Sequence, residues 1–178
     1  MSVPQMPPYI KRLTSGEWAS LPLPERALHV ARAQLDLNVR ELSPNWGGMV
    51  TVYLRVSGWR SPAPWCAAFV YWCLIEAGAD KKKLWPRPAS TLSLAQWAKK
   101  AGRLRSAPSR GTVFVWNNGR SGHTGFVRAV ADAAVGTLEG NTDDAGSREG
   151  VKVAERMRLI SSFRRYRYWG FINLEGLE

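Results

Sequence analysis

The chain has 178 residues, which is enough for one domain with a continuous hydrophobic core that needs no disulfide or metal ion to hold it. Apolar residues make up 45% and charged residues 22%, a globular balance that excludes a largely disordered chain, and no apolar run approaches the roughly 18 residues of a membrane-spanning helix. The net charge of +11 calls for an anionic partner, whether nucleic acid, a membrane surface or a cell-wall polymer, and charge alone does not choose among these.

The N-terminal segment predicts little chemistry. Residues 1–22 are rich in proline and turn-forming residues, including Pro4, so we expect an arm on the surface of a single domain that spans residues 23–178. The N-terminus lacks the charged start, continuous apolar centre and cleavage site of a secretory signal. We therefore expect synthesis in the cytoplasm without a signal peptide, and export by another route.

Four helices are expected in the first part of the domain. Residues 24–38 carry apolar side chains at helical spacing, and a shorter helix that carries Val50, Tyr53 and Leu54 ends near Gly58. Residues 64–78 begin with a proline, end with a glycine and are apolar on every side of a helix, which predicts a helix buried in the domain centre. After a charged loop, residues 90–102 begin with a Ser or Thr cap and end at a glycine.

From Gly111 onward the pattern changes to short runs rich in β-branched and aromatic residues, separated by glycine, asparagine and aspartate turns. The runs are GTVFVWNN, HTGFVRAV, VGTLEGN and RYWGFINL. Helices followed by strands indicate an α+β fold in which helices pack on one antiparallel sheet.

Cys66 is the candidate nucleophile. It follows Pro64 and Trp65 where the buried helix begins, and the unpaired N–H groups and positive dipole end of a helix stabilise a thiolate and a developing oxyanion. Cys73 falls in the middle of the same helix, where a cysteine acts as a small buried hydrophobic residue. On a helix the two Cα atoms are about 10 Å apart, too far for a disulfide, so both thiols should be free.

A cysteine nucleophile needs a base, and the chain has two histidines. His29 falls inside the first predicted helix and is interpreted as a surface or boundary residue. His123 starts a strand between Gly122 and Gly125, where its ring can face a cleft, and is the candidate base.

The imidazole of a base works best when a third group fixes its orientation. In the strand TLEGNT, Glu139 and Asn141 stand at alternate positions and should point to one face. Either one can orient His123 while the other contacts substrate or water, and the sequence does not say which.

These pieces together resemble the CHAP family of papain-like cysteine, histidine-dependent amidohydrolases and peptidases. The run NWGGMVTVYLRVSGWRSPAPWCAAFVYWCLIEAG is followed by GTVFVW, SGHTGFV, LEGNT and GFI, in the family's order, over roughly residues 45–172. The resemblance implies a papain-like core with the nucleophile Cys66 at the start of a buried helix, His123 as base, and Glu139 with Asn141 as polar partners.

The resemblance also implies the substrate. CHAP enzymes mostly hydrolyse peptidoglycan, either between sugar and stem peptide as N-acetylmuramoyl-L-alanine amidases or within the peptide as endopeptidases. No wall-binding repeat domain is present, so we expect Trp65, Trp116 and Gly122, helped by Trp46, Trp59 and the basic surface, to bind substrate. We expect no cofactor and no metal, since the one candidate calcium loop, Asn141-Thr142-Asp143-Asp144, lacks a full ligand set.

Two biological settings fit such an enzyme: a phage lysin, or an antibacterial effector with secretion machinery and an immunity protein as partners. In both it acts at the cell wall or periplasm, and we expect a monomer that binds no nucleic acid.

Three alternatives remain at this stage. A non-catalytic basic module would bind wall polymer or nucleic acid in a salt-dependent way. A glycoside hydrolase would need two carboxylates in one cleft, and only Glu139 is placed convincingly. A Cys-His acyl transferase would pass the acyl group to an amine. The basic residues near the C-terminus are also consistent with an ordinary solvent-exposed face that binds no specific partner. They are Arg148, Lys152, Arg156, Arg158, Arg164, Arg165 and Arg167.

Overall fold

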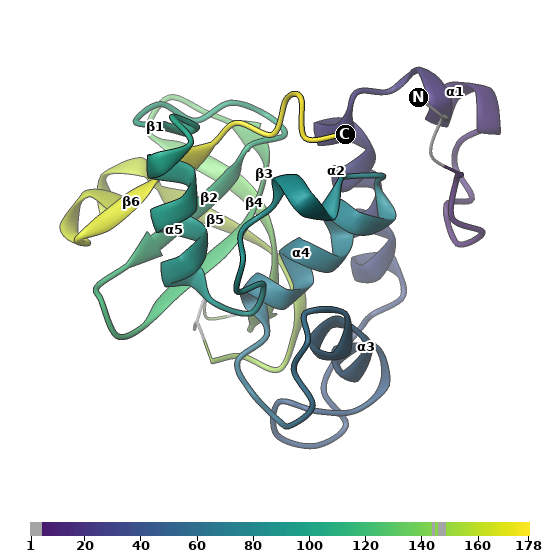
Figure 1. The fold of residues 1–178 in the computed structure, drawn as a ribbon, viewed down its shortest axis with the longest axis horizontal. Helices are drawn as coiled ribbons and strands as arrows, with labels where there is room; N and C mark the ends of the chain where they lie inside the picture. The colour runs from purple at the N-terminus through teal and green to yellow at the C-terminus, as the bar shows by residue number, and fades with distance from the viewer. Residues whose placement is uncertain (1–4, 144, 146–148) are drawn as a thin grey trace.

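The protein folds into helices packed on one sheet, as a computed structural model that describes residues 5–143, 145 and 149–178 (Figure 1). Pro4 of the predicted arm, Asp144 of the calcium candidate and Arg148 of the basic segment lie outside the described residues. The helices are α1 (Ser15–Ser20), α2 (Leu23–Asp36), α3 (Gly48–Val56), α4 (Cys66–Glu76) and α5 (Thr91–Lys100), with short 3-10 turns η1 (Lys81–Lys83) and η2 (Ile160–Arg165). The strands are β1 (Leu104–Arg105), β2 (Val113–Asn117), β3 (Gly122–Val130), β4 (Ala134–Thr142), β5 (Lys152–Leu159) and β6 (Tyr168–Ile172).

All neighbouring strands of the sheet run antiparallel, in the order β1-β6-β2-β3-β4-β5. Helices α2, α4 and α5 pack on one face of this sheet (Figure 1). The predicted α+β class is therefore confirmed. None of the described helices is both long and apolar enough to cross a bilayer.

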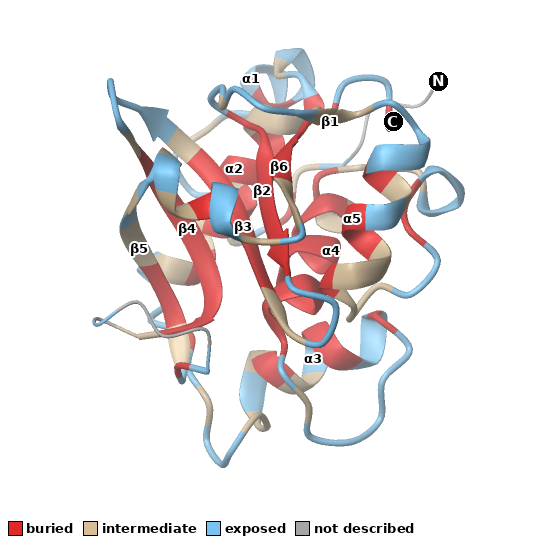
Figure 2. Cartoon of the chain, turned by 90° about the vertical axis from the view of Figure 1, so that its left-hand side faces the viewer, coloured by how far each residue is buried: buried red, intermediate tan, exposed pale blue. Residues whose placement is uncertain are grey.

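Helix α4 lies at the centre of the core (Figure 2). Its residues from Cys66 to Leu74 are all buried, as the uniformly apolar sequence predicts. Side chains of β2, β3, β4 and β6 meet the helices from one face of the sheet, whereas their alternate neighbours form a second apolar cluster on the other face. The second cluster consists of Phe114, Trp116, Val127, Val135, Phe163 and Phe171.

The N-terminal segment is more firmly attached than an arm of turns. Its helix α1, which was not predicted, begins with a capping box at Thr14 and Glu17 and buries Trp18. Upstream, the ring of Tyr9 stacks on Trp72 of α4 at 6.1 Å, and its hydroxyl donates to Glu76 at 2.9 Å. Aromatic burial thus ties this segment to the central helix.

Strand β5 was also not predicted as a strand. Its charged residues, which indicate a solvated segment, are half-buried, Val153 and Ala154 are buried, and the exposed positions carry Met157 and Leu159. It pairs along most of β4 and places Arg158 opposite Val135. This pairing brings a basic side chain to the face of the sheet that carries the second apolar cluster.

Gly140 allows α4 to pack closely on β4. A Cβ atom at this position would lie 2.6 Å from Cζ3 of Trp65 and 2.8 Å from Cβ of Phe69, closer than real carbon contacts come. Any side chain here would push the start of α4 away from the sheet.

We predict that Gly140→Ala lowers the free energy of unfolding by about 1–3 kcal/mol through this overpacking, measured by urea denaturation. Gly16→Ala is the control, because a Cβ there meets nothing within 4 Å. Equal stability of the two variants would show that α4 does not approach β4 this closely.

Candidate active site

Cys66 is the first residue of α4. The preceding residue, Trp65, occupies the N-cap position, and no side chain of the described residues caps this end of the helix. The first backbone N–H groups of α4 therefore remain available as donors beside the thiol. Cys66 is 4% exposed, and the surface that it keeps lines a cleft.

His123 lies in β3 directly opposite Trp116 of β2, and its ring is fully buried. Its Nε2 is 2.7 Å from Oε2 of Glu139. The other nitrogen, Nδ1, makes no hydrogen bond within the described residues. The thiol of Cys66 lies close enough to the ring to raise its pKa. The imidazole thus stands between the thiol on one side and a carboxylate on the other.

The charge state of His123 follows from these neighbours. Burial by itself lowers the pKa of the imidazole, but the neighbouring Cys66 thiol and the hydrogen-bonded Glu139 carboxylate outweigh it and raise the pKa to about 9. The ring is therefore protonated at neutral pH. A protonated ring is the partner that a thiolate needs, and it carries the proton that a leaving amine takes up.

Glu139 is held by more than the histidine. Arg158 donates to both of its carboxylate oxygens in a bidentate pair, and the Thr137 hydroxyl donates to Oε1 at 2.5 Å. Burial raises the pKa of this carboxyl, yet the hydrogen bonds and charges of Arg158 and His123 prevail and lower it to about 2. Glu139, one of the two candidates for orienting His123, is in hydrogen-bond contact with the ring.

Asn141 is buried and adopts a left-handed backbone conformation, with φ at 57°. The pairing of β4 with β5 is irregular between Glu139 and Thr142. Simple alternation along the strand therefore does not determine where the Asn141 side chain points, and its role as a polar partner stays a prediction.

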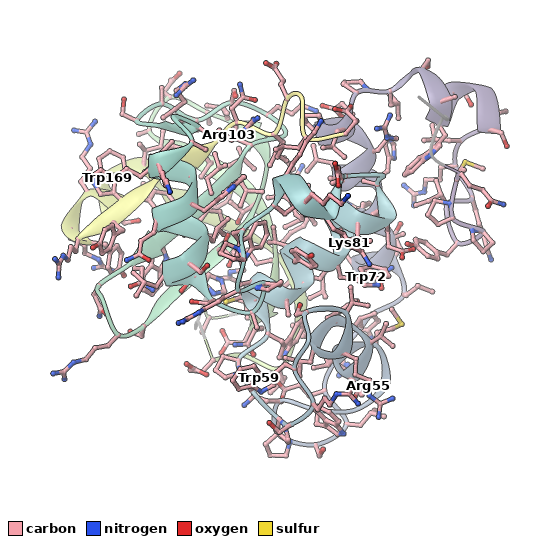
Figure 3. The ribbon with its side chains drawn as sticks, viewed as in Figure 1. Arg55, Trp59, Trp72, Lys81, Arg103 and Trp169 are labelled. Carbon is pink, nitrogen blue, oxygen red and sulfur yellow. The ribbon has the colours of Figure 1, made fainter. Side chains whose placement is uncertain are left out.

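The Cys66 cleft has a volume of about 620 Å3, within the range of substrate sites. Three segments surround it: the loop after α3, the loop before α5, and the turn between β2 and β3. The lining includes Trp59, Arg87, Arg120 and Gly122. Trp59 is half exposed and lies near α3 in Figure 3. Of the residues predicted to bind substrate, Gly122 is one that lines this cleft.

The structure separates the other predicted tryptophans from this cleft. Trp65 has no exposed surface; its indole N–H donates to Glu41 at 2.8 Å, and its ring packs on Tyr53. It presents no surface to a substrate and supports the start of α4 from within the core. Trp116 is 8% exposed and lines a second cavity, while Trp46 packs against the core.

The remaining cysteine and histidine lie elsewhere. Cys73 is completely buried in the middle of α4, and burial, with the nearby Glu76 charge, raises the pKa of its thiol well above the usual value. His29 lies on α2, where burial lowers the pKa of its imidazole. Within the described part of the chain, no group of three or more His, Cys, Asp or Glu side chains gathers as a metal site would require.

Arg158 is the residue of this arrangement that the sequence analysis missed. The charged sequence around it predicts a solvent-exposed position, but its side chain is 17% exposed. Its guanidinium lies 5.6 Å from the centre of the Phe114 ring. The missing signal was strand β5, because only the register opposite Val135 shows that Arg158 reaches Glu139.

Comparison with known families agrees with this geometry. Residues 57–141, which include Cys66, His123, Glu139 and Asn141, match the family model described as the CHAP domain. The protein carries a CHAP domain. No curated protein and no solved structure matches the chain. The CHAP match confirms the resemblance proposed from the motifs, and CHAP domains are typically hydrolases of the cysteine-peptidase type. Arg158 lies beyond the matched segment.

We predict that Arg158→Met lowers the free energy of unfolding at pH 7 by about 3–5 kcal/mol, because it leaves the Glu139 carboxylate buried without its cation. Glu139 stabilises the wild type above about pH 4.5, and this contribution is lost as the pH falls through about 2, so the difference between the proteins should shrink in acid. Urea denaturation at several pH values measures it. Arg164→Met, at an exposed position, is the control; equal losses in both variants would contradict the ion pair.

A second prediction concerns alkaline pH. The pKa of His123 is about 9 in the folded protein against about 6.5 when unfolded, so its contribution is complete below pH 6.5 and is lost as the pH rises through 9. The stability advantage of the wild type over His123→Gln should therefore fall by on the order of 1–3 kcal/mol between pH 6.5 and 9.5. An advantage that stays constant or grows would show that the folded ring is not protonated.

Proposed function

We propose that this protein hydrolyses an amide bond of peptidoglycan, as an N-acetylmuramoyl-L-alanine amidase or a peptide endopeptidase, by a Cys-His thiol mechanism. The observation that carries the proposal is the His123 ring, which is hydrogen-bonded to the Glu139 carboxylate and neighbours the Cys66 thiol, itself part of the lining of an open cleft. The CHAP domain supports the substrate class, because peptidoglycan amidases and peptidases make up much of that family.

The first half of the reaction is acyl transfer to sulfur. The Cys66 thiolate attacks the amide carbonyl carbon, and the carbonyl oxygen becomes an oxyanion. When this tetrahedral intermediate collapses, the C–N bond breaks and the protonated His123 gives its proton to the leaving amine. An acyl thioester on Cys66 and a neutral imidazole remain.

The second half of the reaction hydrolyses the thioester and regenerates the free enzyme. Neutral His123 takes a proton from water, the hydroxyl attacks the thioester carbonyl, and the carboxylic acid leaves as the Cys66 sulfur departs. The imidazolium and thiolate are then restored. Glu139 keeps its negative charge throughout and holds the ring by Nε2, while Arg158 keeps that carboxylate ionised.

The start of α4 supplies the oxyanion donors in this mechanism. The backbone N–H groups of the first turn, including that of Cys66, are free of a side-chain cap among the described residues and lie at the positive end of the helix dipole. The helix that presents the nucleophile thus also stabilises the charge that its attack creates.

We further propose a setting in which the chain is made in the cytoplasm and acts at the cell wall or periplasm, as a phage lysin or a secreted antibacterial effector. The net charge of +11 supports this, since wall and envelope polymers are anionic. An effector would have secretion machinery and an immunity protein as partners, and we expect the enzyme to act as a monomer.

The test is mass spectrometry of purified peptidoglycan after incubation with wild type, Cys66→Ala or Cys73→Ala. We predict new amine and carboxyl termini with wild type, a loss of at least about a thousandfold in rate for Cys66→Ala because no nucleophile remains, and activity within about threefold of wild type for Cys73→Ala. The fragment masses identify the cleaved bond.

Cys73 is a matched control because it is a buried thiol on the same helix. Unchanged fragments from walls of several chemotypes, with all three proteins folded, would overturn the proposal. Cleavage that survives in Cys66→Ala would overturn the assignment of the nucleophile.

A further inference from the structure

A second cavity of about 360 Å3 lies beside the Cys66 cleft. Trp116 and Phe163 line it, and both belong to the apolar cluster on the face of the sheet that α2, α4 and α5 do not cover. Ser121, in the turn between β2 and β3, lines this cavity and the Cys66 cleft alike. A substrate bound over Cys66 can therefore extend across this turn into the second cavity.

The polar lining of the cavity is cationic. Two arginines, Arg158 and Arg165, and the polar side chains of Asn118, Ser121 and Ser162 contribute to it, and none of its described lining residues is acidic. The charge of Arg158 is balanced by its ion pair with Glu139. The net positive charge of the cavity therefore comes from Arg165. Such a lining attracts a negatively charged group.

The Arg158 guanidinium has donors to spare. Glu139 engages Nε and Nη2, whereas Nη1 makes no hydrogen bond within the described part of the chain. The residue is 17% exposed and lines the cavity. One face of the guanidinium thus holds the carboxylate that orients His123, and the remaining N–H groups are available to a ligand.

Arg165 is held in position at the rim. Its Nη2 donates to the hydroxyl of Tyr166 at 3.0 Å, and its guanidinium lies 5.1 Å from the centre of that ring. Tyr166 in turn stacks on Trp116 at 4.0 Å with an angle of 14° between the rings. The stacked aromatic pair forms one wall of the cavity beside the cationic groups.

We propose that this cavity binds a free carboxylate of the peptide substrate, so that the enzyme prefers stem peptides with an ionised carboxylate near the cleaved amide over the same peptides amidated at that position. A planar carboxylate matches the paired N–H groups of an arginine, whereas a neutral amide offers one acceptor and brings donors that face guanidinium groups. The proposal rests on the peptidoglycan hydrolase function proposed above.

The experiment compares two synthetic muropeptides that differ only in whether this carboxylate is free or amidated. Wild type, Arg165→Gln and Arg164→Gln are assayed; Arg164 is exposed, has the same charge and does not line the cavity. We predict that wild type and Arg164→Gln prefer the free acid at least about tenfold in kcat/KM, mainly through KM, and that Arg165→Gln reduces the preference to within about threefold.

A binding measurement separates this proposal from the hydrolase function. Isothermal titration of Cys66→Ser, which cannot cleave, with both muropeptides should show tighter binding of the free acid, and the difference should disappear in Cys66→Ser with Arg165→Gln. If neither peptide is cleaved but this difference is found, the hydrolase proposal fails and the carboxylate site stands.

Two results would overturn the carboxylate site. One is cleavage of both peptides at equal efficiency, which would leave the hydrolase function intact. The other is a titration in which the free acid binds no better than the amide. In the cleavage assay, Arg164→Gln serves as the control and must keep the preference that Arg165→Gln loses.

Discussion

A carboxylate without access to water needs a compensating cation, and the arrangement around Glu139 is built on this constraint. Its side chain is fully buried, and Arg158 and His123 share the task of compensating its charge. Because Arg158 keeps the carboxylate ionised, His123 faces a fixed negative charge on one side and is free to interact with Cys66 on the other. The protonation state of the catalytic candidates therefore depends on a residue of β5 that touches neither the thiol nor the cleft around it.

Helix α4 connects this polar group to the core. Its apolar residues fill the space between the sheet and the surrounding helices, so its position is determined by packing along its whole length. Gly140 and the buried Trp65 set how closely its first turn approaches β4. The location of Cys66 relative to His123 is thus a result of core packing, and the loops that line the cleft have little influence on it.

The local sequence was sufficient to predict the α+β class and most of the candidate site residues. The helix start just after Pro64, the strand around His123 and the Glu-x-Asn pattern are short-range signals, and the CHAP match over residues 57–141 includes all three. Three features could not be derived in this way. The role of Arg158 depends on strand register between distant segments, the burial of Trp65 depends on Glu41 and Tyr53, and the irregular end of β4 removes the alternation that placed Asn141. Each depends on tertiary structure, which a local sequence pattern does not encode.

The attachment of the N-terminal segment has a practical consequence for anyone who handles this protein. Tyr9 lies against Trp72 and Glu76, and Trp18 is almost completely buried, although the sequence predicts a proline-rich surface arm. A truncation that removes this segment would uncover Trp72 on the helix that carries Cys66. Such a shortened chain would tend to aggregate at high concentration, and the resulting loss of soluble protein would then be mistaken for a lack of enzymatic activity.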